Sequence, residues 1–343
     1  MAKPKKDLSK IVPEKTKSDG QSIPISEIDS HIRQVTAMEA DLKKDELTLT
    51  RSYLIQCRVY MSVAKDCEIL GKELTRHSSY SEDKFLLGIE FFNKAIHYDY
   101  LQASIPSRNG IGGGGIGGME ALKHAASCQK AIAESYVYEI NKPKQASLEY
   151  EKEANMRLEA AGACIKAISS NIPAPTNGFQ RYRIRFMEDA AQAFFNSGRV
   201  FESGSDVASF NEQLASHGMP GLDEQNSIKL KKWITLCTEL ERFKREHPKA
   251  SLKDQNKRLA EISRDIGVKD VKVIINPSSN RLFVQNTSIV VQGKKYAVDY
   301  ISDRLVVCDL AKYNKFLDLS NQAIQLEKTI NAQEQHAQKI MRH

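Results

Sequence analysis

Apolar side chains recur at intervals of three and four residues from about residue 26 to residue 217. The pattern is clear in Ile28, Ile32 and Val35, then over 53–70, and again over 85–96. Positions three and four apart lie on one face of an α-helix, so this spacing predicts a series of amphipathic helices. Such helices bury their apolar faces by packing against one another, which restricts the region to a helical bundle or solenoid.

Short turn-forming segments separate the predicted helices. A glycine-rich run occupies 107–118, Pro143 follows a turn at Asn141, and 171–178 contains two prolines. Short connections favour antiparallel neighbours, so 26–217 is predicted to be one helical domain. The glycine-rich run is interpreted as a linker, because it follows a helical pattern and not the strand that a dinucleotide-binding loop requires.

Two stretches within 131–215 resemble the helix pair of tetratricopeptide repeats. The small and aromatic positions of that motif are matched by Tyr138, Asn141, Ala146 and Tyr150 in the first stretch, and by Ala191, Phe194, Gly198, Ser203 and Val207 in the second. The two stretches are not one repeat apart, and the tryptophan of the motif is missing. The resemblance implies tetratricopeptide-like packing of helix pairs, with a groove for a protein or peptide.

The character of the chain changes after residue 222. Helical patterns at 228–243 and 251–265 are followed by runs rich in β-branched residues. The runs are 271–275, 281–285, 288–292, 294–301 and 304–310, and turn residues separate them. This alternation predicts an antiparallel β-meander, so residues 222–311 are expected to form a small α+β domain.

The two ends of the chain have different patterns. Residues 1–25 are rich in lysine and poor in large apolar side chains, which predicts a disordered basic tail. In 312–343, small or apolar residues from Phe316 to Ile340 follow the alternating spacing of a coiled-coil seam. That seam predicts an amphipathic helix that self-associates, docks onto its own chain or packs on a partner's helix. The fold class predicted for the whole chain is mainly α.

No pattern in the sequence indicates catalysis. The chain has no GxSxG nucleophile motif and no P-loop lysine. His124 and Cys128 are one helical turn apart, as two metal ligands can be, but no second group of ligands accompanies them and core packing is the interpretation. We therefore expect no catalytic residue, no metal and no cofactor, and favour a function that is not enzymatic.

The sequence also limits the compartment. It lacks the run of about 18 apolar residues that a membrane-spanning helix needs, and its first residues do not form an apolar secretory signal. Its six cysteines are scattered, without a CxxC pair. These features predict an intracellular protein and do not distinguish cytoplasm from nucleus.

The leading functional hypothesis is a protein-interaction scaffold built on the helical domain. Aromatic side chains are frequent anchors in interfaces. The candidate anchors are Tyr136, Tyr138, Tyr150, Phe194, Phe195 and Phe201. The same side chains would equally suit the core of a helical domain, so exposure decides between the two interpretations. The sequence does not identify the protein partner.

The alternative is a DNA-binding regulator. The segment 259–275 resembles a helix-turn-helix, with Gly267 at the turn and Val273 in the second helix, and the strands that follow would complete a winged form over 228–300. The net charge of +7 permits nucleic-acid binding. The DNA contacts would come from Lys257, Arg258, Arg264, Lys269 and Lys272. The strand propensity of 271–275 instead favours a helix–turn–strand junction.

Overall fold

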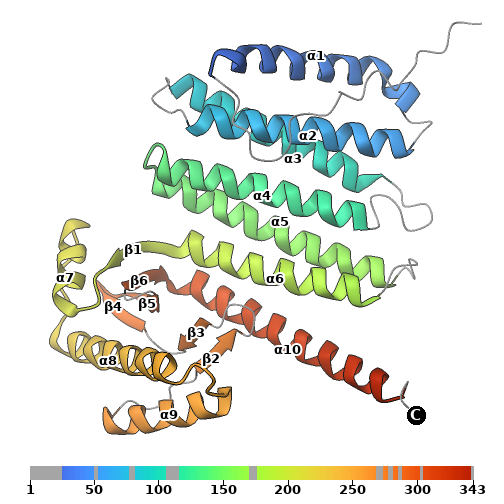
Figure 1. Ribbon diagram of the computed structural model, residues 1–343. Helices are drawn as coiled ribbons and strands as arrows, with labels where there is room; N and C mark the ends of the chain where they lie inside the picture. Colours follow the sequence, from blue (N-terminus) through green and yellow to red (C-terminus); the bar gives the residue numbers. More distant parts are fainter. Residues whose placement is uncertain are drawn as a thin grey trace, which may run out of the picture. The chain divides into compact units, whose positions relative to one another are not determined.

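The computed structural model shows a mainly α protein, as predicted from the sequence (Figure 1). It describes residues 25–49, 53–76, 82–105, 116–169, 176–267, 273–276, 281–284, 288–301 and 304–340. These residues contain ten helices and six strands. None of the described helices is both long and apolar enough to cross a membrane. The predicted basic tail falls, apart from its last residue, outside the described residues.

The described residues divide into two compact units. Unit 1 comprises those up to Ala193 together with those from Ala332 onward, and unit 2 comprises those from Phe194 to Asn331. The limits expected from the sequence, 26–217, 222–311 and 312–343, differ from this division. Strand pairing is the reason, because residues 199–203 join a sheet formed by strands near residue 300.

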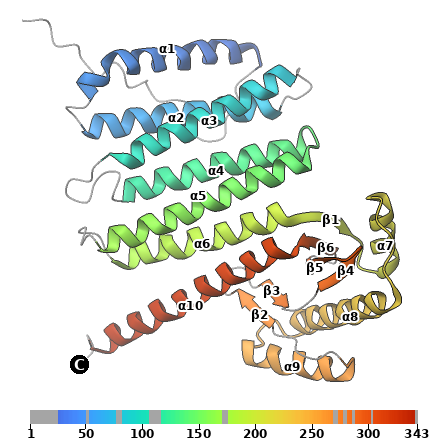
Figure 2. The same ribbon diagram turned by 180° about the vertical axis from the view of Figure 1, so that it is seen from behind.

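Unit 1 is a stack of long helices. They are α1 (Ile25–Leu49), α2 (Tyr53–Arg76), α3 (Glu82–Ser104), α4 (Ile116–Tyr138), α5 (Pro143–Ser169) and α6 (Thr176–Gly198), the last as far as Ala193. Figures 1 and 2 show them as successive layers, and the helices from α1 to α5 each pack against their neighbours in sequence. Helix α4 begins at Ile116, so the last three residues of the expected 107–118 linker are helical.

Helices α2 and α3 approach each other closely. A Cβ atom at Gly71 would lie 2.8 Å from the ring of Phe92, and one at Gly88 would lie 2.8 Å from Cγ2 of Thr75. Both distances are shorter than non-bonded atoms tolerate, so glycine allows the two helices to approach closely. The buried rings of Phe91 and Phe92 fill the core beside this crossing.

The turn between α4 and α5 confirms a sequence prediction. Asn141 has a φ of 48°, a left-handed conformation that asparagine tolerates better than most residues. The N–H of Lys142 donates to the carbonyl oxygen of Tyr136 at 2.7 Å, which closes the turn. Helix α5 then begins with Pro143, whose missing N–H is harmless in the first turn of a helix.

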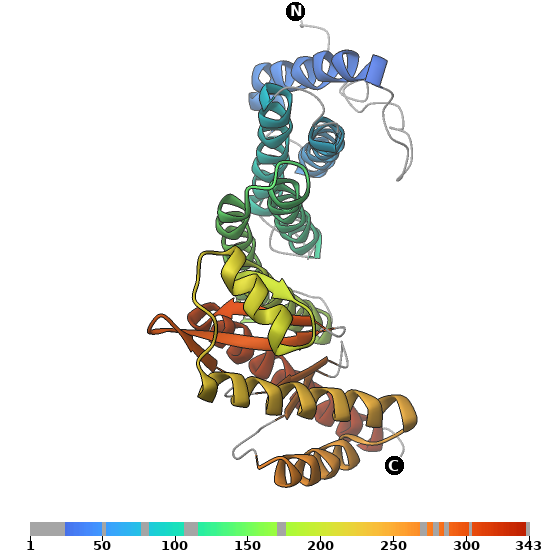
Figure 3. The ribbon, with the colours of Figure 1, turned by 90° about the vertical axis from the view of Figure 1, so that its left-hand side faces the viewer.

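Unit 2 combines helices with two small sheets. Its helices are α7 (Val207–Ser216), α8 (Glu224–Glu246), α9 (Leu252–Asp265) and α10 (Leu310–Ile340), the last as far as Asn331. Its strands are β1 (Arg199–Ser203), β2 (Val273–Asn276), β3 (Arg281–Val284), β4 (Ser288–Val291), β5 (Lys294–Ile301) and β6 (Arg304–Asp309). Figure 3 shows α8 and α9 beside these strands. Ser251 caps the N-terminus of α9 in a capping box with Asp254.

The sheet topology corrects two expectations. The predicted meander is split, since β4, β5 and β6 form one antiparallel sheet whereas β2 and β3 form a separate hairpin. The first sheet also gains β1, in an order β1-β6-β5-β4. The helical domain predicted over 26–217 is interrupted here, because α7 begins only at Val207 and Glu202 of β1 pairs with Val306. A strand of five residues is too short to show its period beside long helices.

Helix α10 packs against its own chain. Phe316 is 2% exposed, Ala323 and Ile330 are also buried, and the ring of Phe316 lies 5.2 Å from that of Phe195 between centroids. These residues form the first half of the expected seam. The side chains of Ala337 and Ile340 lie outside the described residues. The contacts favour docking on the same chain, and self-association through 312–343 stays a prediction.

Candidate functional site

The most unusual chemistry in unit 1 surrounds His124, where three helices meet. His124 projects from α4, Glu68 from α2 and Asp99 from α3. Nδ1 of His124 lies 2.7 Å from Oδ2 of Asp99, and Nε2 lies 2.8 Å from Oε2 of Glu68. Both ring nitrogens therefore face a carboxylate at hydrogen-bond distance, which is the arrangement of a charged imidazolium.

Electrostatics in this cluster favour the charged form of the histidine. Burial opposes that charge, but the hydrogen bonds to Asp99 and Glu68 outweigh burial and raise the pKa of His124 to about 9. Burial likewise opposes the charge of Glu68, whose hydrogen bonds with His124 and Lys72 nevertheless lower its pKa to about 2. Lys72 approaches the other oxygen, Oε1, at 2.5 Å. The cluster is thus a chain of alternating charges between three helices.

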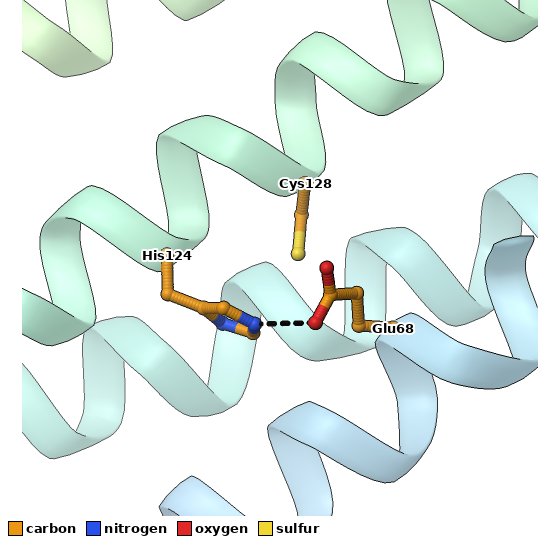
Figure 4. A group of neighbouring side chains, drawn as sticks. All are labelled: Glu68, His124 and Cys128. Carbon is orange, nitrogen blue, oxygen red and sulfur yellow. Dashed lines mark hydrogen bonds and ion pairs between the residues drawn. The ribbon is translucent and has the colours of Figure 1, made fainter. Parts of the chain in front are cut away.

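Cys128 is the fourth member of the cluster. It follows His124 by one turn of α4, so both side chains leave the same helix face (Figure 4). Its Sγ, a nitrogen of His124 and a carboxylate oxygen of Glu68 all lie within 4.8 Å of one another. Burial, with the negative charges of Glu68 and Asp99, raises the pKa of this thiol well above its ordinary value. Without a cation, Cys128 is a neutral thiol and a poor nucleophile.

This geometry limits what the cluster can do. A general base needs a ring nitrogen with a free lone pair facing its substrate, and both nitrogens of His124 are engaged by carboxylates. The donor set of imidazole, thiol and carboxylate is instead suited to hold a transition-metal ion. Among the described residues, Glu68, His124 and Cys128 are the one group found with this property.

A second buried polar group lies between α5 and α6. Arg157 Nη2 donates to Glu153 Oε1 at 3.3 Å, and Arg157 Nη1 lies 3.2 Å from Asp189 Oδ2. Oε2 of Glu153 and Nε of Arg157 are buried without a hydrogen-bond partner among the described residues. Burial outweighs the attraction of Arg157 and raises the pKa of Glu153 to about 7. This pair is less completely satisfied than the His124 cluster.

The six aromatic residues expected as anchors differ in their exposure to solvent. Tyr138 is 75% exposed at the end of α4, whereas Tyr136 is partly buried against Phe85. The other four are in the core, where each is less than a tenth exposed: Tyr150, Phe194, Phe195 and Phe201. Five of the six are therefore buried or partly buried, because the helices and the strand that carry them turn these side chains inward.

The residues expected to contact DNA are only partly described. Lys257 and Arg264 are exposed on α9, and Arg258 pairs with Glu261 at 3.2 Å. Lys269 and Lys272 lie outside the described residues. Val273 belongs to β2, not to a second helix, as the strand propensity of this segment indicated. The second helix of a helix-turn-helix therefore cannot include the last three residues of 259–275.

An open pocket of about 470 Å³ lies at the turn between α8 and α9. Residues 243 and 246–250 line it, together with Asp254. Asp254 is already engaged in the capping box with Ser251, and Glu246 and Lys249 are exposed to solvent. The pocket therefore offers apolar surface and solvated charges but no buried ionisable group for chemistry.

The sequence indicated two members of the His124 cluster and missed the other two. Spacing alone paired His124 with Cys128. Glu68 and Asp99 come from helices 56 and 25 positions away from His124. The available signal was a polar residue on an apolar face, since Asp99 follows buried Phe92 and Ala95 at intervals of seven and four.

Comparison with known proteins gives no guidance on function. No family model matches the chain, and neither the curated proteins nor the solved structures contain a significant match.

Proposed function

We propose that this protein is a non-enzymatic scaffold that binds protein partners through its helical unit. The observation that supports this proposal is the stacking of α1 to α5, in which each helix packs mainly against its neighbours in sequence. Proteins built in this way present long continuous surfaces, and they commonly use them to bind other proteins. The His124 cluster agrees with this role, since its ring nitrogens are engaged within the chain.

The α4–α5 hairpin carries the surface that best fits an anchor. Tyr138 is 75% exposed next to the Asn141 turn, and Leu148 is 55% exposed on the following helix. A solvent-exposed tyrosine contributes a large apolar ring and a hydroxyl donor at small entropic cost, which is why tyrosines often dominate binding energy. We assign Tyr138 as the main contact of the scaffold with its partner.

Photo-crosslinking tests this assignment. A photoreactive phenylalanine replaces Tyr138 in the full chain, expressed in cells, and a matched variant carries it at exposed Glu90 of α3. We expect one protein to crosslink at position 138 and not at position 90. In a pull-down without crosslinking, the Tyr138→Glu variant should recover at least tenfold less of this protein than the wild-type chain does. The proposal fails if position 138 crosslinks nothing beyond what position 90 crosslinks.

The alternative, DNA binding through unit 2, is supported by one observation. Lys257 and Arg264 are exposed on α9, where they could contact phosphates. Titration of random-sequence duplex DNA with the full chain at low and high salt tests it. Salt-sensitive binding that is lost in a Lys257→Glu/Arg264→Glu variant would favour this alternative, and absence of binding at low salt would reject it.

A further inference from the structure

We propose that Glu68, His124 and Cys128 form a zinc-binding site. Three different donor types come from two helices, and their atoms lie within 4.8 Å of one another. Zinc accepts thiolate, imidazole and carboxylate ligands in one tetrahedral site. The Nε2–Oε2 distance of 2.8 Å belongs to a hydrogen bond. With metal bonds of about 2.0–2.2 Å, the distance between the two atoms would have to increase by roughly half an ångström.

Asp99 supplies the support that a metal-binding histidine requires. A ligating histidine usually donates its second N–H to a carboxylate, which fixes the tautomer and the direction of the lone pair. The Nδ1 atom of His124 lies 2.7 Å from Asp99 Oδ2, and the Asp99 side chain is 3% exposed. This contact leaves Nε2 directed at Glu68, beside Cys128. Asp99 is therefore a positioning residue of the site and not a ligand.

The two oxygens of the Glu68 carboxylate have different partners, and this arrangement suits a metal ligand. Lys72 approaches Oε1, whereas Oε2 faces His124. One oxygen is thus held by an ammonium group and the other remains available as a monodentate ligand. Lys72 and Glu68 are one turn apart on α2, and the contact of Oε2 with His124 directs the carboxylate toward α4.

Charge balance favours the exchange of protons for zinc. Zn²⁺ would displace one proton from the imidazolium of His124 and one from the thiol of Cys128, and both protons would pass to solvent. The two lost positive charges equal the charge of the ion, so the formal charge of the cluster is unchanged. Binding therefore adds no net charge to a buried site, which would otherwise be costly.

The donor set and the exposure select the metal and the coordination. Magnesium and calcium prefer all-oxygen sites, whereas a thiolate with an imidazole suits zinc. The side chains of Glu68 and His124 are 20% and 24% exposed, so solvent reaches one side of the cluster. Water would complete the fourth position. Because its ligands come from α2 and α4, zinc would link two helices that are not consecutive in the sequence.

Metal binding by the full chain tests the proposal directly. After removal of metal with a chelator, the protein is titrated with Zn²⁺ and, separately, with Co²⁺ as a spectroscopic probe. We expect one equivalent of each, a sulfur-to-cobalt charge-transfer band, and a melting temperature that rises with Zn²⁺ concentration. Absence of any stoichiometric binding would overturn the proposal.

Variants locate the site and separate its parts. Cys128→Ser should abolish the charge-transfer band, whereas Cys164→Ser, at a buried cysteine beside Met119 of the same unit, should leave it intact. Asp99→Asn should keep the band but lower the affinity for Zn²⁺ about 10–100-fold, as loss of a carboxylate that supports a metal ligand does. Glu68→Gln, at a partly exposed position, tests the third ligand should Asp99→Asn fail to fold. Zn²⁺ binding that survives both Cys128→Ser and Glu68→Gln would refute the site.

Discussion

Two regions of unit 1 hold charged side chains between helices, and they differ in how many of the polar atoms have hydrogen-bond partners. Around the α2–α3–α4 interface, His124 satisfies both ring nitrogens and the helices approach through glycines. Around α5, the Glu153–Arg157 pair leaves one atom of each residue without a hydrogen-bond partner among the described residues. Buried charges are tolerated when every group is paired, and they reduce stability when pairing is partial. The first region should therefore be sensitive to any change, and the second should be open to improvement.

The largest effect is expected for His124→Leu in metal-free protein. The change leaves Asp99 and Glu68 without their shared cation, and removal of one partner from a buried ion network costs about 3–5 kcal/mol. Urea unfolding followed by far-UV circular dichroism measures it. Trp233, the single tryptophan, lies in unit 2 and reports on that unit by fluorescence.

His97→Leu is the matched control for this substitution. His97 is exposed on α3, and exposed positions usually change stability by within about 0.5 kcal/mol. If the two variants lose similar stability, the His124 network does not stabilise unit 1 as a fully paired network should, and its contrast with the Glu153–Arg157 pair is wrong.

A large pH-dependent effect is expected for Glu153→Gln. The folded pKa of Glu153 is about 7, above the ordinary value of 4.5. Its contribution to stability is therefore fully present below pH 4.5 and is lost as the pH rises through 7. Over this window the wild type should lose about 3 kcal/mol more than the variant, from the shift of the pKa.

Denaturation at several pH values between 4.5 and 8 measures this difference. Glu90→Gln, at an exposed carboxylate of α3, is the control and should follow the wild-type profile. Parallel curves for the wild type and Glu153→Gln would show that the pair is better satisfied than its geometry indicates.

An intermediate effect is expected for Gly71→Ala. The added methyl group would lie 2.8 Å from the buried ring of Phe92, and overpacking of this kind costs about 1–3 kcal/mol. The melting temperature of the full chain measures the loss. An unchanged value would mean that α2 and α3 can separate freely, and the description of this interface as tight would then be incorrect.

The smallest effect is expected for Gly162→Ala on α5. Among the described residues, nothing outside the helix lies within 4 Å of the position that its Cβ would occupy. Alanine favours the helix over glycine by up to about 1 kcal/mol, so this variant should be slightly more stable than the wild type. A loss of stability would show that α5 is as closely packed as α2, which would remove the distinction between the regions.

The fold followed from the sequence where structure is local. The periodic apolar residues located the long helices, and Asn141 with Pro143 placed the α4–α5 turn, because each signal is contained within a few neighbouring residues. The β1 strand was missed because Phe201 and Ser203 face inward only through pairing with β6. A helix and a short strand cannot be separated without knowledge of that partner.

The candidate site was only half predictable for a similar reason. His124 and Cys128 share one helix, so their spacing predicts that they are neighbours. Glu68 and Asp99 join them only when the rotation of α2 and α3 about their own axes is fixed by packing. The glycine contacts at Gly71 and Gly88 help to fix it, and no local pattern in the sequence encodes that rotation. Which of the six aromatic candidates are exposed could not be predicted either, since exposure depends on the neighbouring elements.

The pairing of β1 with β6 sets an order of events during synthesis. Helices α1 to α5 can pack one after another as they leave the ribosome, because each finds its partner in the adjacent stretch of chain. Strand β1 emerges early but pairs with residues about a hundred positions later, such as Cys308. Until β6 is made, neither edge of β1 is paired, and unpaired edges readily pair with other chains. The interval between the two strands is therefore when a nascent chain is most exposed to aggregation, and slower translation through 204–303 would lengthen it.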